Sequence, residues 1–113
     1  MLKATIFRTF VDALFVRKRT GIEGTLHAAI GLAGEAGEVL DIVKKSWVYG
    51  KALDEAKLQE EAGDVLHYLT MLCIKMGWTW QDLIDNNTAK LNKRYPNGYT
   101  DQAAIARADQ GPV

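Results

Sequence analysis

The sequence predicts an all-α protein, built as a four-helix and mostly antiparallel bundle. Apolar residues recur at helical spacing through most of the chain, and Ile6, Phe10 and Leu14 are the first example. The 2 prolines, Pro96 and Pro112, leave these periodic segments uninterrupted. Because the breaks between the segments are short, consecutive helices are expected to run antiparallel to each other.

The first two helices are expected at about residues 3–18 and 26–47. Between them the segment TGIEGT breaks the pattern, and Thr25 is a suitable N-cap because its hydroxyl can accept from an early helical N–H group. An apolar stripe is expected to hold the second helix against the core. Its members are Leu26, Ile30, Ala33, Gly37 and Leu40.

Capping signals bound the third helix, which is expected at about residues 55–76. Gly50 closes the preceding helix, Asp54 caps the start of the third, and Gly77 ends it. The predicted core stripe of this helix contains Leu58, Val65, Leu69, Leu72 and Met76.

The fourth helix is expected to begin after Thr79 and to end near Arg94. Asp82 follows Thr79 by three positions, which resembles a capping box. The segment YPNG then ends the helix, because proline and glycine both favour a turn.

The length of 113 residues indicates one domain, which would span residues 1–113. Its core would cover about residues 3–96. Residues 97–113 would form a C-terminal tail with one short helical turn before it frays.

Composition excludes several classes of protein. The 14 basic residues balance the 14 acidic ones, which argues against broad nucleic-acid binding. The single Cys73 excludes an intrachain disulfide and lies in an apolar run, where we expect it to be buried. We find no secretory signal and no apolar run long enough to cross a bilayer, so we expect a cytoplasmic protein without a membrane partner.

Two pairs of carboxylates at helical spacing are the most informative feature of the chain. Glu35 and Glu38 form one pair, and Glu61 and Asp64 form the other. No Lys or Arg lies three or four residues from Glu35 or Glu38. Such carboxylates in an apolar helix are costly unless another group supplies positive charge, and Mg²⁺ prefers oxygen ligands of this kind.

The antiparallel arrangement allows the two acidic pairs to face each other across the second and third helices. The face of the second helix that carries Glu35 is not polar, because it also contains Ala28, Gly31 and Ile42. Gly31, Gly34 and Gly37 permit close approach by a ligand or another backbone. A solvated helix face is the alternative, and for Glu61 this alternative is stronger because Lys57 precedes it by four residues.

Asn87, Lys90 and Arg94 follow one face of the fourth helix, where Lys and Arg can bind phosphate groups. By composition alone, a solvated basic stripe is the commoner interpretation of a helix C-terminus. Tyr95 can stack on a base and His27 can contact a nucleotide, although structural packing explains either side chain as well.

The segments GLAGEAGEV, EEAGDVLHYL and NTAKLNKRYPNGY occur in this order between about residues 26 and 99. Together they resemble the MazG-like all-α nucleoside triphosphate pyrophosphohydrolases, especially the short stand-alone bacterial and phage members. The motif of that family is E-x-x-E followed, after a variable gap, by E-x-x-D. The resemblance implies that the metal ligands are Glu35, Glu38, Glu61 and Asp64 and that the metal is Mg²⁺, with Mn²⁺ as a substitute.

The resemblance also implies a reaction. A nucleoside or deoxynucleoside triphosphate would be hydrolysed to a nucleoside monophosphate and pyrophosphate, as part of nucleotide-pool house-cleaning. Glu35 or Glu38 would be catalytic, because one acid is needed to orient or deprotonate the attacking water. The implied substrate-binding residues are Asn87, Lys90, Arg94, Tyr95 and His27.

Self-association is expected on two grounds. The second helix is apolar on two sides and the first is rich in aromatic residues, so one 113-residue chain offers too little cover for both. The resemblance implies a homodimer or a homotetramer as well.

Three alternatives stay open. A non-catalytic metal- or protein-binding helical module would use the acids to pair with the cations of a partner. A related pyrophosphohydrolase would act on phosphoribosyl-ATP or a nucleotide alarmone. A ferritin-like iron protein is disfavoured, because such proteins use Glu-x-x-His pairs and the sequence contains none.

Overall fold

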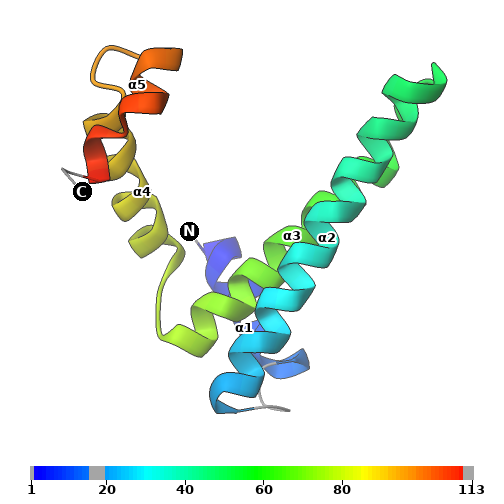
Figure 1. The fold of residues 1–113 in the computed structure, drawn as a ribbon. Coiled ribbons are helices and arrows are strands. Elements are labelled where there is room, and N and C mark those ends of the chain that lie inside the picture. The colour runs from blue at the N-terminus through cyan, green and yellow to red at the C-terminus, as the bar shows by residue number, and fades with distance from the viewer. Residues whose placement is uncertain (1, 16–19, 111–113) are drawn as a thin grey trace. The chain divides into compact units, whose positions relative to one another are not determined.

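The computed structural model describes residues 2–15 and 20–110, and this part of the chain is all-helical, as predicted (Figure 1). The elements are, in chain order, α1 (Leu2–Leu14), α2 (Gly21–Tyr49), α3 (Glu55–Met76), α4 (Trp80–Arg94), α5 (Asp101–Ala106) and the short 3₁₀ helix η2 (Ala108–Gln110). The first predicted helix ends earlier than expected, at Leu14, and its predicted residues 16–18 lie outside the described ranges.

Helices α2 and α3 form an antiparallel pair, as predicted (Figure 1). Gly31 of α2 lies against Tyr68 of α3, and Glu35, further along α2, meets Glu61, which precedes Tyr68 on α3. The two helices approach closely at Gly31, because an added Cβ there would overlap the Tyr68 ring. An added Cβ at Gly34 or at Gly37 would meet no neighbouring atom of the described residues. Close approach of the two helices therefore explains the glycine at position 31 and not the other two.

The core of the first part of the chain joins α1, α2 and α3. Val11, Ala28 and Met71 are buried at its centre, one from each helix. Partly buried side chains surround them, namely Phe7, Phe15, Tyr68, Leu72 and Ile74. Cys73 is buried, as predicted, and its thiol is not in a disulfide. This packing determines which face of α3 lies against α2.

The ends of α3 and α4 agree with their predicted capping signals. The Asp54 carboxylate accepts from the Lys57 backbone N–H at 3.0 Å, and Gly77 ends α3 in the left-handed region with a φ of 75°. Thr79 and Asp82 form the complete capping box at the start of α4.

The predicted start of α2 is wrong. The helix begins at Gly21 with Thr20 as its N-cap, so Thr25 lies inside the helix and donates its hydroxyl to the Gly21 carbonyl at 3.4 Å. The prediction treats the two glycines of TGIEGT as a break in the helix. Gly24 is instead buried, and tertiary packing there outweighs the low helix propensity of glycine.

The predicted core stripe of α2 is also wrong. Leu26, Ile30 and Leu40 are 55%, 62% and 66% exposed, and the remaining members, Ala33 and Gly37, are not buried either. The opposite face, with Ala28 and Gly31, packs against the rest of its unit. Because both faces of α2 are apolar, helical periodicity alone did not distinguish the packed face from the exposed one.

The chain divides into two compact units, Met1–Trp78 and Thr79–Val113. The first unit contains α1, α2 and α3, and the Arg8 guanidinium donates to the Trp78 carbonyl within it at 2.7 Å. The second unit contains α4, α5 and η2. The four-helix bundle and the single-domain organisation therefore stay predictions.

Candidate metal centre

Three of the four predicted acids come together between α2 and α3. Glu35, Glu61 and Asp64 each offer a carboxylate oxygen, and these oxygens lie within 4.8 Å of one another. Glu61 is the buried member, and the other two are half-buried. Helical spacing aligns Glu61 with Asp64, and the antiparallel register of α2 brings Glu35 opposite to them.

A hydrogen bond joins two acids of the cluster and shifts their pKa values in opposite directions. Glu35 and Glu61 are hydrogen-bonded through their carboxyl groups, and this bond is the main reason that the pKa of Glu35 lies above its ordinary value of 4.5. Burial and the negative charges of Asp64, Glu61 and Glu38 raise this pKa further. The pKa of Glu61 is lowered, mainly by Lys57 and then by the bond to Glu35. Glu35 therefore keeps a proton to higher pH than Glu61 does, and when it is protonated it is the donor of this bond and Glu61 is the acceptor.

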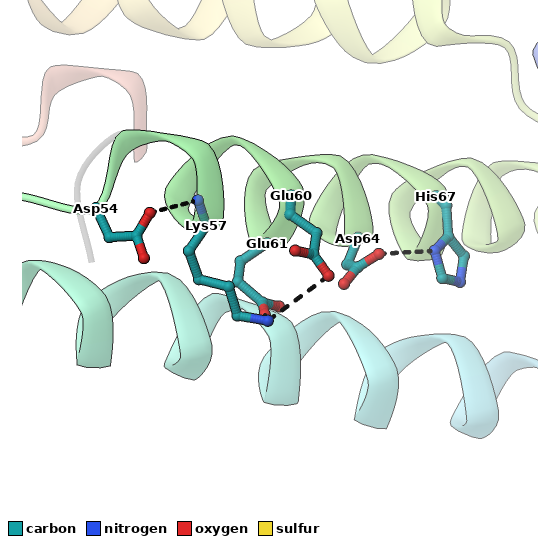
Figure 2. A network of polar contacts seen from close by, with 6 residues as sticks. All are labelled: Asp54, Lys57, Glu60, Glu61, Asp64 and His67. Carbon is teal, nitrogen blue, oxygen red and sulfur yellow. Dashed lines mark hydrogen bonds and ion pairs between the residues drawn. The ribbon is translucent and has the colours of Figure 1, made fainter.

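Lys57 supplies a positive charge at the edge of the cluster. Its Nζ lies 3.2 Å from Glu61 Oε1 and 3.6 Å from Glu60 Oε1. Figure 2 shows the Lys57 ammonium beside the Glu61 carboxylate, with a dashed line to Glu60. The pairing of Lys57 with Glu61, one turn apart on α3, was an open alternative in the sequence and is present in the structure.

Glu38 lies outside the three-acid cluster. It is exposed, and it lines a pocket of about 360 Å³ near the connection of α2 to α3. Asp41 and Lys45 line the same pocket and form an ion pair of 2.8 Å. The charge of Glu38 nevertheless contributes to the raised pKa of Glu35. The structure thus brings together three of the four predicted ligands and leaves the fourth beside them.

Two histidines pack against aromatic side chains, and one of them, His67, lies beside Asp64. His67 stacks on Phe15, with ring centroids 4.9 Å apart, and burial lowers its pKa, so the imidazole is neutral at pH 7. Its Nδ1 lies 3.9 Å from Asp64 Oδ1, which is too far for a hydrogen bond (Figure 2). His27 contacts the edge of the Tyr68 ring and lines an open groove of about 450 Å³ with Glu23, Leu26 and Ile30.

In the second unit, Arg94 is held by a residue that sequence reasoning missed. The Arg94 guanidinium donates from Nε and Nη2 to both oxygens of Asp109, at 2.5 and 3.0 Å. The two side chains are only 14% and 7% exposed. This pairing raises the pKa of Arg94 and lowers the pKa of Asp109. Asp109 lies 15 residues away in the tail, so no helical period connects the two.

The other predicted residues of α4 are more open. Asn87 and Lys90 are exposed on the helix, and Tyr95 packs against Tyr99 with ring centroids 5.2 Å apart. Lys90 lines an open groove of about 440 Å³, together with Asn86, Ala89, Lys93 and Asp109. Two lysines at this groove make it electrostatically suited to an anion, and Asp109 partly offsets their charge.

The three-acid cluster fits a hard divalent cation. Carboxylate oxygens are the ligands that Mg²⁺ and Mn²⁺ prefer. Without a cation, three carboxylates this close cannot all be ionised cheaply, and the negative charges of Asp64 and Glu61 contribute to the raised pKa of Glu35 after its hydrogen bond and its burial. Glu35, Glu61 and Asp64 therefore have both the donor atoms and the excess of negative charge that such an ion requires.

The described fold and cluster define an all-helical protein with an acidic site suited to a divalent metal. The profile of the MazG nucleotide pyrophosphohydrolase domain matches residues 24–99, about two thirds of the chain, and the protein belongs to this family. It is accordingly an enzyme of the nucleotide pyrophosphohydrolase class. No curated protein and no solved structure matches the chain significantly.

All members of the acidic cluster, and the predicted substrate-binding residues, fall inside the matched range 24–99. Asp109 falls outside it. Within the described residues, no helix combines the length and the apolar character that a membrane span requires.

Proposed function

We propose that the protein hydrolyses nucleoside or deoxynucleoside triphosphates to a nucleoside monophosphate and pyrophosphate, with Mg²⁺ as the metal and Mn²⁺ as a substitute. The observation that carries this proposal is the meeting of Glu35, Glu61 and Asp64 inside the range that matches the family. Removal of unwanted nucleotides from the cellular pool is the role that we infer for this activity.

In this proposal Glu35, Glu61 and Asp64 hold the metal, and Glu38 completes the set from its neighbouring position on α2. A bound Mg²⁺ would neutralise charge on the phosphate oxygens and make the phosphorus easier to attack. Because the pKa of Glu35 is raised, metal binding at this carboxyl competes with its protonation.

We assign the handling of the attacking water to Glu38 or Glu35. Glu38 is exposed and lies outside the three-acid cluster, which leaves its carboxylate available to accept a proton from water. Glu35 is able to do so in its ionised form, and its raised pKa makes it the more basic carboxylate of the pair with Glu61. Attack on the α-phosphorus would then leave the β- and γ-phosphates together as pyrophosphate.

We assign phosphate binding to Asn87, Lys90 and Arg94 of α4. Lys90 is exposed beside a groove, whereas Arg94 already donates to Asp109. A phosphate that binds Arg94 through the same N–H groups must therefore replace the Asp109 carboxylate or share the guanidinium with it. Tyr95 is proposed to stack on the base and His27 to contact the nucleotide.

We also propose that the protein works as a homodimer or a homotetramer. The exposed apolar residues of α2 support this assignment, because Ile22, Leu26, Ile30, Leu40 and Trp47 are all more than half exposed along one helix. Burial of these side chains against a second copy would remove apolar surface from water at about 25 cal/mol per Å².

A substrate panel tests the proposed reaction. The protein is incubated with each common NTP and dNTP and Mg²⁺, and the products are separated by chromatography. The proposal expects a nucleoside monophosphate and pyrophosphate in equal amounts, and no turnover in EDTA. Release of a nucleoside diphosphate and orthophosphate would place the attack at the γ-phosphorus and would refute the proposal.

A further inference from the structure

The ion pair at the cluster joins Lys57 to a buried acid. Only 9% of the Glu61 side chain is exposed, whereas 49% of the Lys57 side chain is. The carboxylate is thus fixed within the helix pair, and the ammonium approaches it from the solvent side. An ionised carboxylate in that position requires a nearby cation, and in the structure Lys57 fills this requirement at 3.2 Å.

Lys57 also has a second carboxylate within reach. Glu60 follows it by three residues, with 64% of its side chain exposed, and lies 3.6 Å from the same Nζ atom. Figure 2 shows this arrangement, in which the Lys57 ammonium lies close to both carboxylates and forms an ion pair with each. A small rotation of the lysine stem would therefore transfer the ammonium from Glu61 to Glu60 without leaving it unpaired.

A divalent cation bound by Glu61 and the ammonium of Lys57 would compete for the same carboxylate. At a separation of a few ångströms they would also repel each other, with twice the charge product of a pair of single charges. Metal binding at the cluster would therefore displace Lys57 from Glu61, and Glu60 offers the place to which it would move.

We infer that Lys57 is an internal placeholder for the divalent metal: it stabilises Glu61 in the metal-free protein and moves to Glu60 when the metal binds. This inference rests on the proposed metal site. It makes Lys57 a positioning residue that lowers the affinity for metal and, in exchange, stabilises the metal-free fold.

The test is a calorimetric titration of the full chain with Mn²⁺ at one fixed pH near 8 and without nucleotide. Lys57→Met removes the charge and keeps most of the length of the stem. The backbone N–H of residue 57 still donates to Asp54, so the N-cap of α3 is retained. We expect the dissociation constant for Mn²⁺ to fall about tenfold, because the competing charge is gone. The melting temperature without metal should fall, and its increase on adding Mn²⁺ should be larger than in the wild type.

Two further variants test whether the change in Mn²⁺ affinity is specific to the positive charge at position 57. Lys75→Met removes another lysine of α3, in the last turn of the helix and 14 residues after Glu61, and it should bind Mn²⁺ like the wild type. Lys57→Arg keeps the charge and should restore affinity toward the wild-type value. Circular dichroism confirms that each variant is folded at the titration temperature.

The titrations separate an error about Lys57 from an error about the metal site. If the wild type binds Mn²⁺ and Lys57→Met binds it equally or more weakly, the placeholder role is refuted while the metal site stands. If the wild type binds no divalent metal at all, the metal site and this inference fall together.

Discussion

Glu35 of α2 and Glu61 of α3 share a hydrogen bond between their carboxyl groups, across the antiparallel helix pair that carries the two predicted acid motifs. The bond raises the pKa of Glu35 above its ordinary value and helps to lower the pKa of Glu61, so Glu35 is the first of the two to take up a proton as the pH falls. The same two side chains are proposed to bind metal, so the protonated pair and the metal-bound pair exclude each other.

Glu35→Gln tests this relationship. The amide introduced at position 35 can donate to Glu61 without a titratable proton, so the metal-free protein should be at least as stable as the wild type. The variant should lose most of the increase in melting temperature that Mg²⁺ or Mn²⁺ gives the wild type, because one ligand oxygen has lost its charge. Differential scanning fluorimetry with and without millimolar metal measures both effects. An undiminished metal response would remove Glu35 from the site.

The raised pKa of Glu35 predicts a pH dependence of stability. A carboxyl whose folded pKa lies above its unfolded value contributes stability that is complete below the unfolded value, here 4.5. This contribution is lost as the pH rises through the folded pKa. Urea unfolding of the metal-free wild type and of Glu35→Gln at several pH values isolates it. The stability difference, wild type minus variant, should fall from pH 4.5 upward, and a constant difference would contradict the raised pKa of Glu35.

The phosphate-binding role of α4 predicts a specific kinetic pattern. Lys90→Ala and Arg94→Ala should each raise KM roughly tenfold or more, because each removes a charge-assisted contact to phosphate. Some loss of kcat should accompany this, since the charge on the phosphate changes during transfer. Glu38→Gln should mainly lower kcat. Steady-state kinetics on the best substrate separates these effects. Unchanged KM and kcat in both α4 variants would make this face a solvated basic stripe.

Substitution of Asp109 should change KM in the opposite direction from substitution of Arg94. Its carboxylate occupies two of the N–H groups that a phosphate would use, so Asp109→Asn should lower KM by a few-fold. Asp101→Asn is a matched control, because Asp101 lies in the same tail but accepts from the Tyr99 hydroxyl. A rise in KM for Asp109→Asn would mean that Asp109 orients Arg94 for the phosphate and does not compete with it.

The exposed apolar residues of α2 predict self-association. Light scattering across a dilution series should give a dimer or a tetramer, and Ile30→Asp should shift the protein toward the monomer, because a charge would then lie in the contact. Glu23→Gln, a polar change on the same helix, serves as the control. A wild-type monomer at every concentration would contradict the proposed assembly.

Those features of the fold that depend on neighbouring residues could be predicted from the sequence. The bounds of α3 and the capping box of α4 were correct because Asp54, Gly77, Thr79 and Asp82 act within one helical turn. The start of α2 was wrong because its outcome depends on the burial of Gly24, which is a tertiary effect.

In the candidate site, too, the features set by local spacing could be predicted from the sequence, and those set by tertiary packing could not. Glu61 and Asp64 were paired by spacing, and the antiparallel register brought Glu35 to them. The displacement of Glu38 from the cluster depends on the rotation of α2 about its axis, which two apolar faces left ambiguous. Asp109 was missed because its contact with Arg94 spans the tail and follows no period.

The proposed reaction breaks a nucleoside triphosphate between its α- and β-phosphates. Turnover in ¹⁸O-labelled water with Mg²⁺, followed by mass spectrometry of the separated products, tests it most directly. We expect pyrophosphate without label and a nucleoside monophosphate that carries one labelled oxygen. Label in orthophosphate, with nucleoside diphosphate as the other product, would contradict this reaction.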